Sequence, residues 1–221
     1  MNFNFIKNNS LSFNLERVDT DNGRFYKSPN GNLYSSVTTV LSKMNKDGIV
    51  KWRKRVGEEE ANRISKHASS RGTRVHKLCE DYILGKPQEK LNPFQKHLFE
   101  QIRPALDQSV NNVHCLEGKL YSDKLRLAGT VDLISEYNGE LTVIDFKTAG
   151  KLKKEEYIQN YFFQTTCYSL MFQELTGLTA KQIAVIIAVE GESKPQIFIK
   201  RRKDYILPLL NFLKEHHLNG T

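Results

Sequence analysis

Cysteine is scarce in this sequence: the chain has only Cys79, Cys115 and Cys167 among its 221 residues. No CxxC pair or Cys/His spacing typical of zinc sites is present. Three thiolates also cannot fill an iron–sulfur site that needs four cysteines. We therefore expect reduced thiols buried in a core, and no iron–sulfur cluster.

Long apolar runs are also missing. No stretch reaches the length that a membrane-spanning helix needs. The first ten residues, MNFNFIKNNS, contain no sustained apolar region, so a cleavable secretory signal is not expected. These absences predict a protein of a reducing aqueous compartment, the cytoplasm, without a membrane partner.

Acidic residues are fewer than basic ones, 25 against 33, which gives a net charge of +8 and a pI near 9.3. Such an excess suits a polyanionic partner, and nucleic acid is the first candidate. The hydrophobic fraction of 39% is sufficient for a folded core. We interpret residues 1–221 as one domain of ordinary size.

Turn and periodicity signals predict a mixed α/β fold, a central β-sheet flanked by helices. Asn30-Gly31 and Asn138-Gly139 are hairpin signals. Between them the pattern is helical over 47–85 and again over 94–109, where Pro104 favours a kink. After the second hairpin, the order is a helix over 154–175, strands over 182–190 and 195–202, and a closing helix.

Charged residues within the second hairpin indicate a functional site. Asp145 and Lys147 are two apart on an apolar strand and therefore share one face, opposite Phe146. Asp132 lies six residues before Asn138, and Asp145 lies six residues after Gly139. A two-residue turn would thus place the two carboxylates almost opposite one another, roughly 5 Å apart.

Two like charges at that spacing repel unless a cation lies between them. Oxygen ligands favour Mg²⁺, with Mn²⁺ as a substitute, over zinc. The plain alternative is a surface hairpin with an ordinary ion pair between Asp145 and Lys147.

GTVDLI followed by VIDFKT resembles the core motif of the PD-(D/E)xK nuclease superfamily, more narrowly its RecB-type exonuclease branch. Val131 replaces the proline of the classical pattern. The resemblance implies a restriction-endonuclease-like core with Asp132, Asp145 and the backbone carbonyl of Phe146 as metal ligands. It also implies that Lys147 activates or orients the attacking water.

Two further segments carry the same resemblance. GTRVHKLCE supplies His76, similar to the helical histidine ligand of that branch, and Glu80 on the same helix face is read as a polar contact rather than a ligand. FFQTTCYSL supplies Gln164 and Tyr168, similar to a QxxxY motif that supports the lysine or the substrate.

The resemblance covers roughly residues 30–200, and YSSVTTVL and WRKRVGEEEAN are similar to segments of phage exonucleases. It divides the chain into a hairpin and helical DNA-binding part, 1–90, and a nuclease core, 91–221. Basic residues of the first part are expected to track a phosphate backbone, with Arg53, Arg71 and Arg74 the chosen contacts. Trp52, Tyr82 or Tyr26 would stack on an unpaired base.

The predicted function is that of a Mg²⁺-dependent exonuclease acting on single-stranded DNA ends in phage DNA replication, recombination or degradation. Two alternatives remain: a structure-specific or restriction-type endonuclease on the same core, and a DNA-binding recombination accessory without catalysis. The sequence leaves open the polarity of digestion, the number of metals and the oligomeric state.

Overall fold

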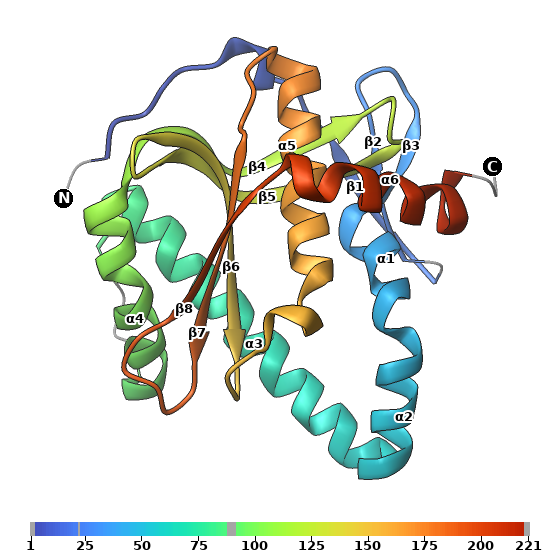
Figure 1. Ribbon diagram of the computed structural model, residues 1–221, viewed down its shortest axis with the longest axis vertical. Helices are drawn as coiled ribbons and strands as arrows, with labels where there is room; N and C mark the ends of the chain where they lie inside the picture. The colour runs from blue at the N-terminus through green and yellow to red at the C-terminus, as the bar shows by residue number, and fades with distance from the viewer. Residues whose placement is uncertain (1–2, 22, 88–91, 219–221) are drawn as a thin grey trace.

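The computed structural model describes residues 3–21, 23–87 and 92–218, and in this part of the chain eight strands form one mixed sheet (Figure 1). The strands are β1 (Glu16–Thr20), β2 (Gly23–Lys27), β3 (Leu33–Ser36), β4 (Val110–Ser122), β5 (Leu127–Tyr137), β6 (Glu140–Ala149), β7 (Gln182–Val189) and β8 (Gln196–Arg201). The α-helices are α1 (Val37–Leu41), α2 (Lys46–Val56), α3 (Glu58–Ile83), α4 (Pro93–Ser109), α5 (Gln159–Thr176) and α6 (Lys203–His216). Short 3₁₀ turns cover Asn9–Leu11, Ser42–Asn45 and Glu155–Tyr157.

The β5–β6 hairpin has the predicted turn and register. Asn138 and Gly139 have φ angles of 53° and 78°, the backbone of a type I′ turn. Pairing runs antiparallel from Tyr137 opposite Glu140 to Leu133 opposite Ile144. The ladder stops one position short of the two aspartates, so the predicted register is confirmed up to their immediate neighbours.

One edge of strand β5 has a gap in its strand pairing. Strand β4 pairs along one edge of β5, so β3 and β6 share the other. On that second edge, β3 pairs parallel with Leu127 and Ala128, and β6 pairs with residues 133–137. In the described structure, residues 129–132 have no strand partner there. Asp132 lies in this gap.

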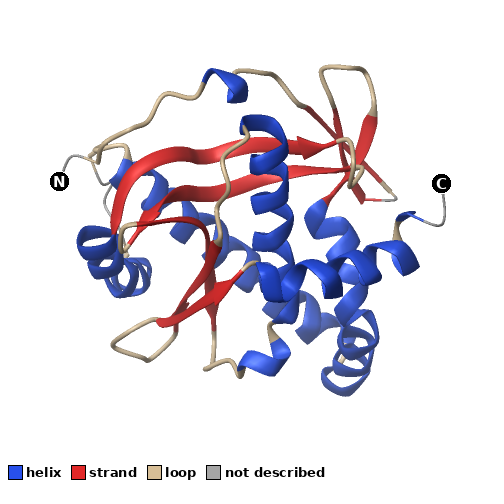
Figure 2. Ribbon diagram, turned by 45° about the horizontal axis from the view of Figure 1, so that its top comes forward, coloured by secondary structure: helices blue, strands red, loops and turns tan. Residues whose placement is uncertain are grey.

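Helices cover both faces of the sheet, as Figure 2 shows. On one face, α1, α5 and α6 enclose a core that includes Val143 of β6. On the other face, α3 and α4 enclose a second core that includes Ile144 and Phe146. The alternation along β6 therefore puts Asp145 and Lys147 on the α5 side and Phe146 on the α3 side. The predicted mixed α/β architecture is confirmed.

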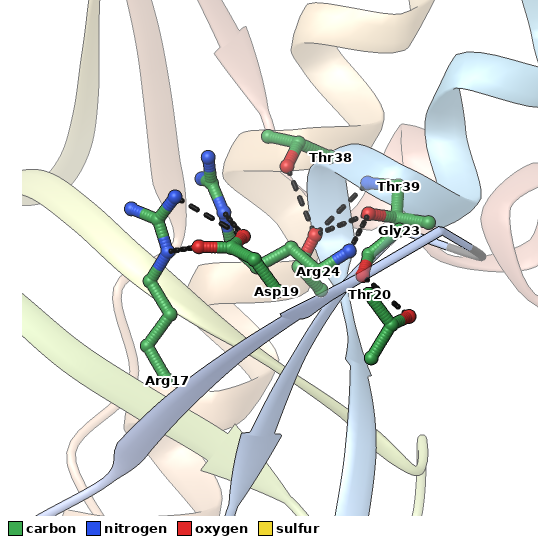
Figure 3. A network of polar contacts seen from close by, with 8 residues as sticks. Arg17, Asp19, Thr20, Gly23, Arg24, Thr38 and Thr39 are labelled. Carbon is green, nitrogen blue, oxygen red and sulfur yellow. Dashed lines mark hydrogen bonds and ion pairs between the residues drawn. The ribbon is translucent and has the colours of Figure 1, made fainter.

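The N-terminal strands extend the sheet beyond β5. The hairpin predicted at Asn30-Gly31 is the β2–β3 connection, but β1 was not predicted. Figure 3 shows how this edge is held: Asp19 binds the guanidinium groups of Arg17 and Arg24. The amide of Arg24 donates to Thr39 Oγ1 at 3.1 Å, which joins the strand to α1.

The predicted helical stretch over 47–85 is two helices, because Gly57 adopts φ 87° and separates α2 from α3. Helix α2 and the start of α3 extend away from the sheet (Figure 1, bottom). The predicted helix over 94–109 is α4, which contains Pro104. The boundary expected between residues 90 and 91 lies outside the described residues. Within those residues, no helix is long and apolar enough to cross a membrane.

Candidate metal centre

Asp145 and Lys147 form a buried ion pair on β6. Nζ of Lys147 lies 2.5 Å from both carboxylate oxygens of Asp145, and Nε2 of Gln164 on α5 donates to Oδ1 at 2.7 Å. The Lys147 ammonium also lies 5.2 Å from the centre of the Tyr161 ring, a cation–π contact. The Lys147 ammonium is therefore the counter-charge of the Asp145 carboxylate.

Asp132 joins three elements at the gap in β5. Its Oδ2 accepts a hydrogen bond of 2.8 Å from the amide of Phe146 on β6. Its Oδ1 lies 3.4 Å from Nδ1 of His76 on α3, and the His76 ring packs edge-on against Phe146. The structure thus brings His76 and Asp132 together with the backbone amide of Phe146, whereas Asp145 and Lys147 point to the α5 side of the sheet.

Glu117 on β4 is a further carboxylate at the site, and the sequence did not reveal it. Its Oε1 is 4.0 Å from Nδ1 of His76, and single donor atoms of His76, Glu117 and Asp132 lie within 4.8 Å of one another. Glu117 occupies the ladder position across from Asp132, with φ 46°. This left-handed backbone is uncommon for glutamate and costs free energy, and residues with such a backbone cluster at functional sites.

An open hollow of about 460 Å³ lies in front of this cluster. It is lined by Gly72, Thr73, His76, Lys77, Glu80 and Glu117. Glu80 accepts from Lys77 at 2.9 Å and contacts neither Asp132 nor Asp145 in the described structure. Solvent and a ligand can therefore reach the imidazole and the Glu117 carboxylate from the α3 side.

The charges of this cluster depend on one another. Burial lowers the pKa of His76, but the charge and close contact of Asp132, with the charge of Asp145 in addition, together outweigh burial and raise that pKa to about 9. Burial alone would raise the pKa of Asp132, yet the imidazolium of His76 holds it below its usual value. Burial, with the Asp132 charge in addition, raises the pKa of Glu117 to about 7. Acids that crowd in this way favour a cation among them.

A second buried acid lies on the α5 side. Burial raises the pKa of Asp145 to about 6, although the nearby ammonium opposes this. Burial would lower the pKa of Lys147, but Asp145 and Asp132 outweigh it and keep the ammonium charged. Oδ2 of Asp145 is buried, and the Lys147 ammonium lies 2.5 Å from it. Several carboxylates close together, with one imidazole beside them, fit a divalent cation that prefers oxygen ligands.

Tyr168 lies beneath the site rather than in the hollow. Its side chain is 2% exposed, and burial raises its pKa well above the usual value. A Cβ at Gly129 would lie 2.6 Å from the Tyr168 hydroxyl, so the ring rests on the backbone of the gap in β5. Gln164 contacts Asp145 directly, whereas Tyr168 is placed to hold β5. The role of the Phe146 carbonyl as a ligand stays a prediction.

The basic residues chosen as DNA contacts have different surroundings. Arg53 on α2 pairs with Glu58 and donates to Asn62, both on α3. Arg71 is largely buried, donates to Thr148 Oγ1 at 3.0 Å and pairs with Glu190.

Arg74 is exposed on α3. Of the aromatic side chains, Tyr26 is buried in the N-terminal core and Tyr82 donates to Asp107, so neither offers a free ring face. Trp52 is half-buried on α2.

Comparisons with known proteins agree with this geometry. Residues 99–204 match the family model of the PD-(D/E)XK nuclease superfamily. Human mitochondrial genome maintenance exonuclease 1 is 30% identical over 168 residues, which cover 68% of this chain and 47% of the human protein. The mouse protein of the same name is 29% identical over 113 residues, 48% of this chain and 32% of its own length.

The chain thus spans about half or less of the length of these curated relatives. A solved structure, that of SSO0001, covers 82% of this chain and 76% of its own with 12% identity and a TM-score of 0.40. The family model and the sequence relatives, which agree with the acids and lysine on β5 and β6, show that this chain belongs to the PD-(D/E)XK nuclease superfamily.

Proposed function

We propose that this protein is a Mg²⁺-dependent exonuclease that hydrolyses DNA phosphodiester bonds and prefers single-stranded ends. The observation that carries the proposal is the convergence of Asp132, Asp145 and Lys147 with His76 at the gap in β5. A binding module has no need of buried acids, since each costs free energy unless it is compensated. A role in DNA replication, recombination or degradation, in a phage and hence in the host cytoplasm, is part of this proposal.

The metal would be held by Asp132 and Asp145, with His76 and Glu117 completing the donor set on the α3 side. The backbone carbonyl of Phe146 remains a predicted ligand. When bound, Mg²⁺ would lower the pKa of a coordinated water and neutralise charge on the phosphate. Mn²⁺ prefers the same oxygen donors and should substitute.

Lys147 would orient the attacking water and stabilise negative charge on the phosphate, since its ammonium stays protonated beside Asp145. Gln164 fixes one oxygen of Asp145 through a 2.7 Å hydrogen bond and so orients the carboxylate. Tyr168 supports the backbone of β5 from below.

The helical arm formed by α2 and the first half of α3 is the proposed path for the DNA strand. Arg53 lies near the tip of this arm, and the exposed Arg74 lies farther along α3, beside the hollow. Phosphate contacts of this kind hold a strand without reading its sequence. A DNA strand bound along this arm would enter the active site with its free end first.

The direct test is hydrolysis of end-labelled single-stranded DNA with Mg²⁺ and with EDTA. Asp145→Asn and Lys147→Ala should each lower the rate on the order of a thousandfold, because each removes a group that acts on the reacting atoms. Lys214→Ala, which changes an exposed lysine at the end of α6, is the control and should cleave at the wild-type rate. Circular dichroism checks that each variant is folded. Wild-type rates in both site variants would refute the assignment.

Covalently closed single-stranded circles separate the proposal from its first rival. An exonuclease leaves them intact, whereas an endonuclease on the same core opens them. Binding of DNA without any cleavage, with and without Mg²⁺, would instead favour the accessory protein.

A further inference from the structure

A second pocket, with several basic residues in its lining, lies at the opposite end of the sheet from the acids. It has a volume of about 430 Å³ and is lined by Thr179, Lys181, Arg201, Arg202, Lys203 and Ile206. These residues come from the loop before β7, the end of β8 and the first turn of α6. Gln182, next to this pocket, pairs with Thr142 at the start of β6, whereas Lys147 pairs with Ile187 near the end of β7.

Arg202 is the unusual member of this pocket. Its side chain is 9% exposed, and Nη1 donates to the hydroxyl and carbonyl oxygens of Ser169 at 3.0 and 3.4 Å. Within residues 3–21, 23–87 and 92–218, no carboxylate pairs with this guanidinium, and Nε and Nη2 have no hydrogen bond. Burial lowers the pKa of Arg202, with no acid to offset the effect. A buried cation without a counter-charge is costly, and a bound anion would remove that cost.

The neighbouring groups leave positive charge unbalanced. Glu140 is engaged by Arg201 and by Nε2 of Gln182 at 3.1 Å. Asp204 is exposed on α6 and does not line the pocket. In the described part of the chain, no ion pair engages Lys181 or Lys203.

The N-terminus of α6 adds to the positive potential of this pocket. The helix has 14 residues, and no side chain caps its first turn. The amide of Arg202 is already bonded to the carbonyl of Lys181 at 2.9 Å, which holds the two cationic residues side by side. Backbone N–H groups at a helix start, with the positive end of the helix dipole, favour an anion.

We propose that this pocket binds a phosphate group, with Arg202, Lys181 and Lys203 as its cationic partners and Thr179 as a hydroxyl donor. The volume lies in the range of small-molecule sites, and Ile206 gives it an apolar wall against which a nucleoside can pack. The phosphate can belong to a mononucleotide or to the backbone of a DNA strand. The inference is independent of the proposed nuclease activity.

The test is a titration of the full chain in EDTA, followed by amide resonances in NMR spectra and by calorimetry. The probes are inorganic phosphate, adenosine 5′-monophosphate, adenosine, and a short oligothymidylate without terminal phosphates. We expect saturable shifts at residues 179–183 and 201–206 with a phosphate-bearing probe and none with adenosine. Monophosphate binding assigns the site to a free nucleotide, and binding of the oligomer alone assigns it to a strand.

Variants locate the binding. Lys181→Gln with Lys203→Gln should weaken the affinity about tenfold or more, since two charge-assisted contacts are lost. Lys153→Gln with Lys214→Gln removes the same charge elsewhere and should bind as wild type. Asp145→Asn should leave the shifts at residues 179–183 and 201–206 unchanged, which separates this site from the nuclease centre. Equal binding of adenosine and its monophosphate, no saturable shift, or equal weakening in both double variants would overturn the proposal.

Discussion

Replacement of Arg71 tests what holds helix α3 against the sheet. The Arg71 side chain is 10% exposed, donates from Nε to Thr148 Oγ1 at 3.0 Å and forms an ion pair with Glu190. Thr148 is the last residue but one of the strand that carries Asp145, and Glu190 directly follows β7. Arg71 therefore joins α3 to two strands, five residues before His76.

The expected magnitude follows from these contacts. A hydrogen bond to a charged group contributes about 1.5–3 kcal/mol when one partner is buried. Glu190 is 33% exposed and regains water when Arg71 is removed, which limits the cost of the orphaned charge. We expect Arg71→Gln to lower the free energy of unfolding by about 2 kcal/mol, and the coupling to Glu190 to be about 1–2 kcal/mol.

The assay is urea denaturation of a double-mutant cycle built from Arg71→Gln and Glu190→Gln. Arg63→Gln is the matched control, because Arg63 lies on the same helix and makes an exposed ion pair with Glu60. Exposed pairs contribute little, so the control should unfold close to wild type.

A coupling below about 0.5 kcal/mol would refute the role of Arg71 as a structural tether. In that case DNA binding by Arg71→Gln should be measured against salt. A slope reduced by about one unit would show that Arg71 contacts a phosphate, as the sequence predicted.

Three further predictions concern the metal centre. Glu117→Gln should reduce the rise in melting temperature that Mg²⁺ or Mn²⁺ produces, because one ligand is lost; an unchanged rise would exclude Glu117 from the donor set. Gly129→Ala should destabilise the fold by about 1–3 kcal/mol through overpacking against the Tyr168 hydroxyl, and Tyr168→Phe in that background should recover part of the loss, as measured by urea denaturation. In EDTA, stability should fall as pH rises from 6.5 through about 9, because folded His76 binds its proton more tightly than the unfolded chain does; a flat profile in thermal melts would contradict the ion pair with Asp132.

Local sequence patterns were sufficient to predict β5 and β6, the two strands that carry Asp132, Asp145 and Lys147. Asn138-Gly139 fixes a type I′ turn, and alternation then decides which side chains oppose each other. Asp145 and Lys147 share a face for the same reason. These inferences hold because a strand period of two needs no knowledge of distant packing.

Strand β4 was not predicted because its alternation is interrupted. Its register against β5 shifts between Asn111 and Val113 and again between Val113 and Cys115, and both Asn112 and Glu117 adopt positive φ. Bulges of this kind destroy the period on which sequence reasoning depends. Glu117 was missed with its strand, although a glutamate before a glycine on the strand preceding GTVDLI was a usable signal.

The gap in β5 explains how one sheet can hold a polar site between two apolar cores. If the pairing of β5 with β6 continued past Leu133, the backbone of β6 beside Asp132 would be occupied by the strand ladder. The Asp132 carboxylate would then need other hydrogen-bond partners. Because β6 separates from β5 at Leu133 and Ile144, the amide of Phe146 is free to donate to Asp132 Oδ2 at 2.8 Å. The same separation lets His76 approach from the α3 side. The Phe146 ring, 1% exposed and edge-on to the His76 ring, positions the imidazole beside Asp132. A smaller side chain at position 146 should therefore displace the Asp132 carboxylate while the sheet remains folded.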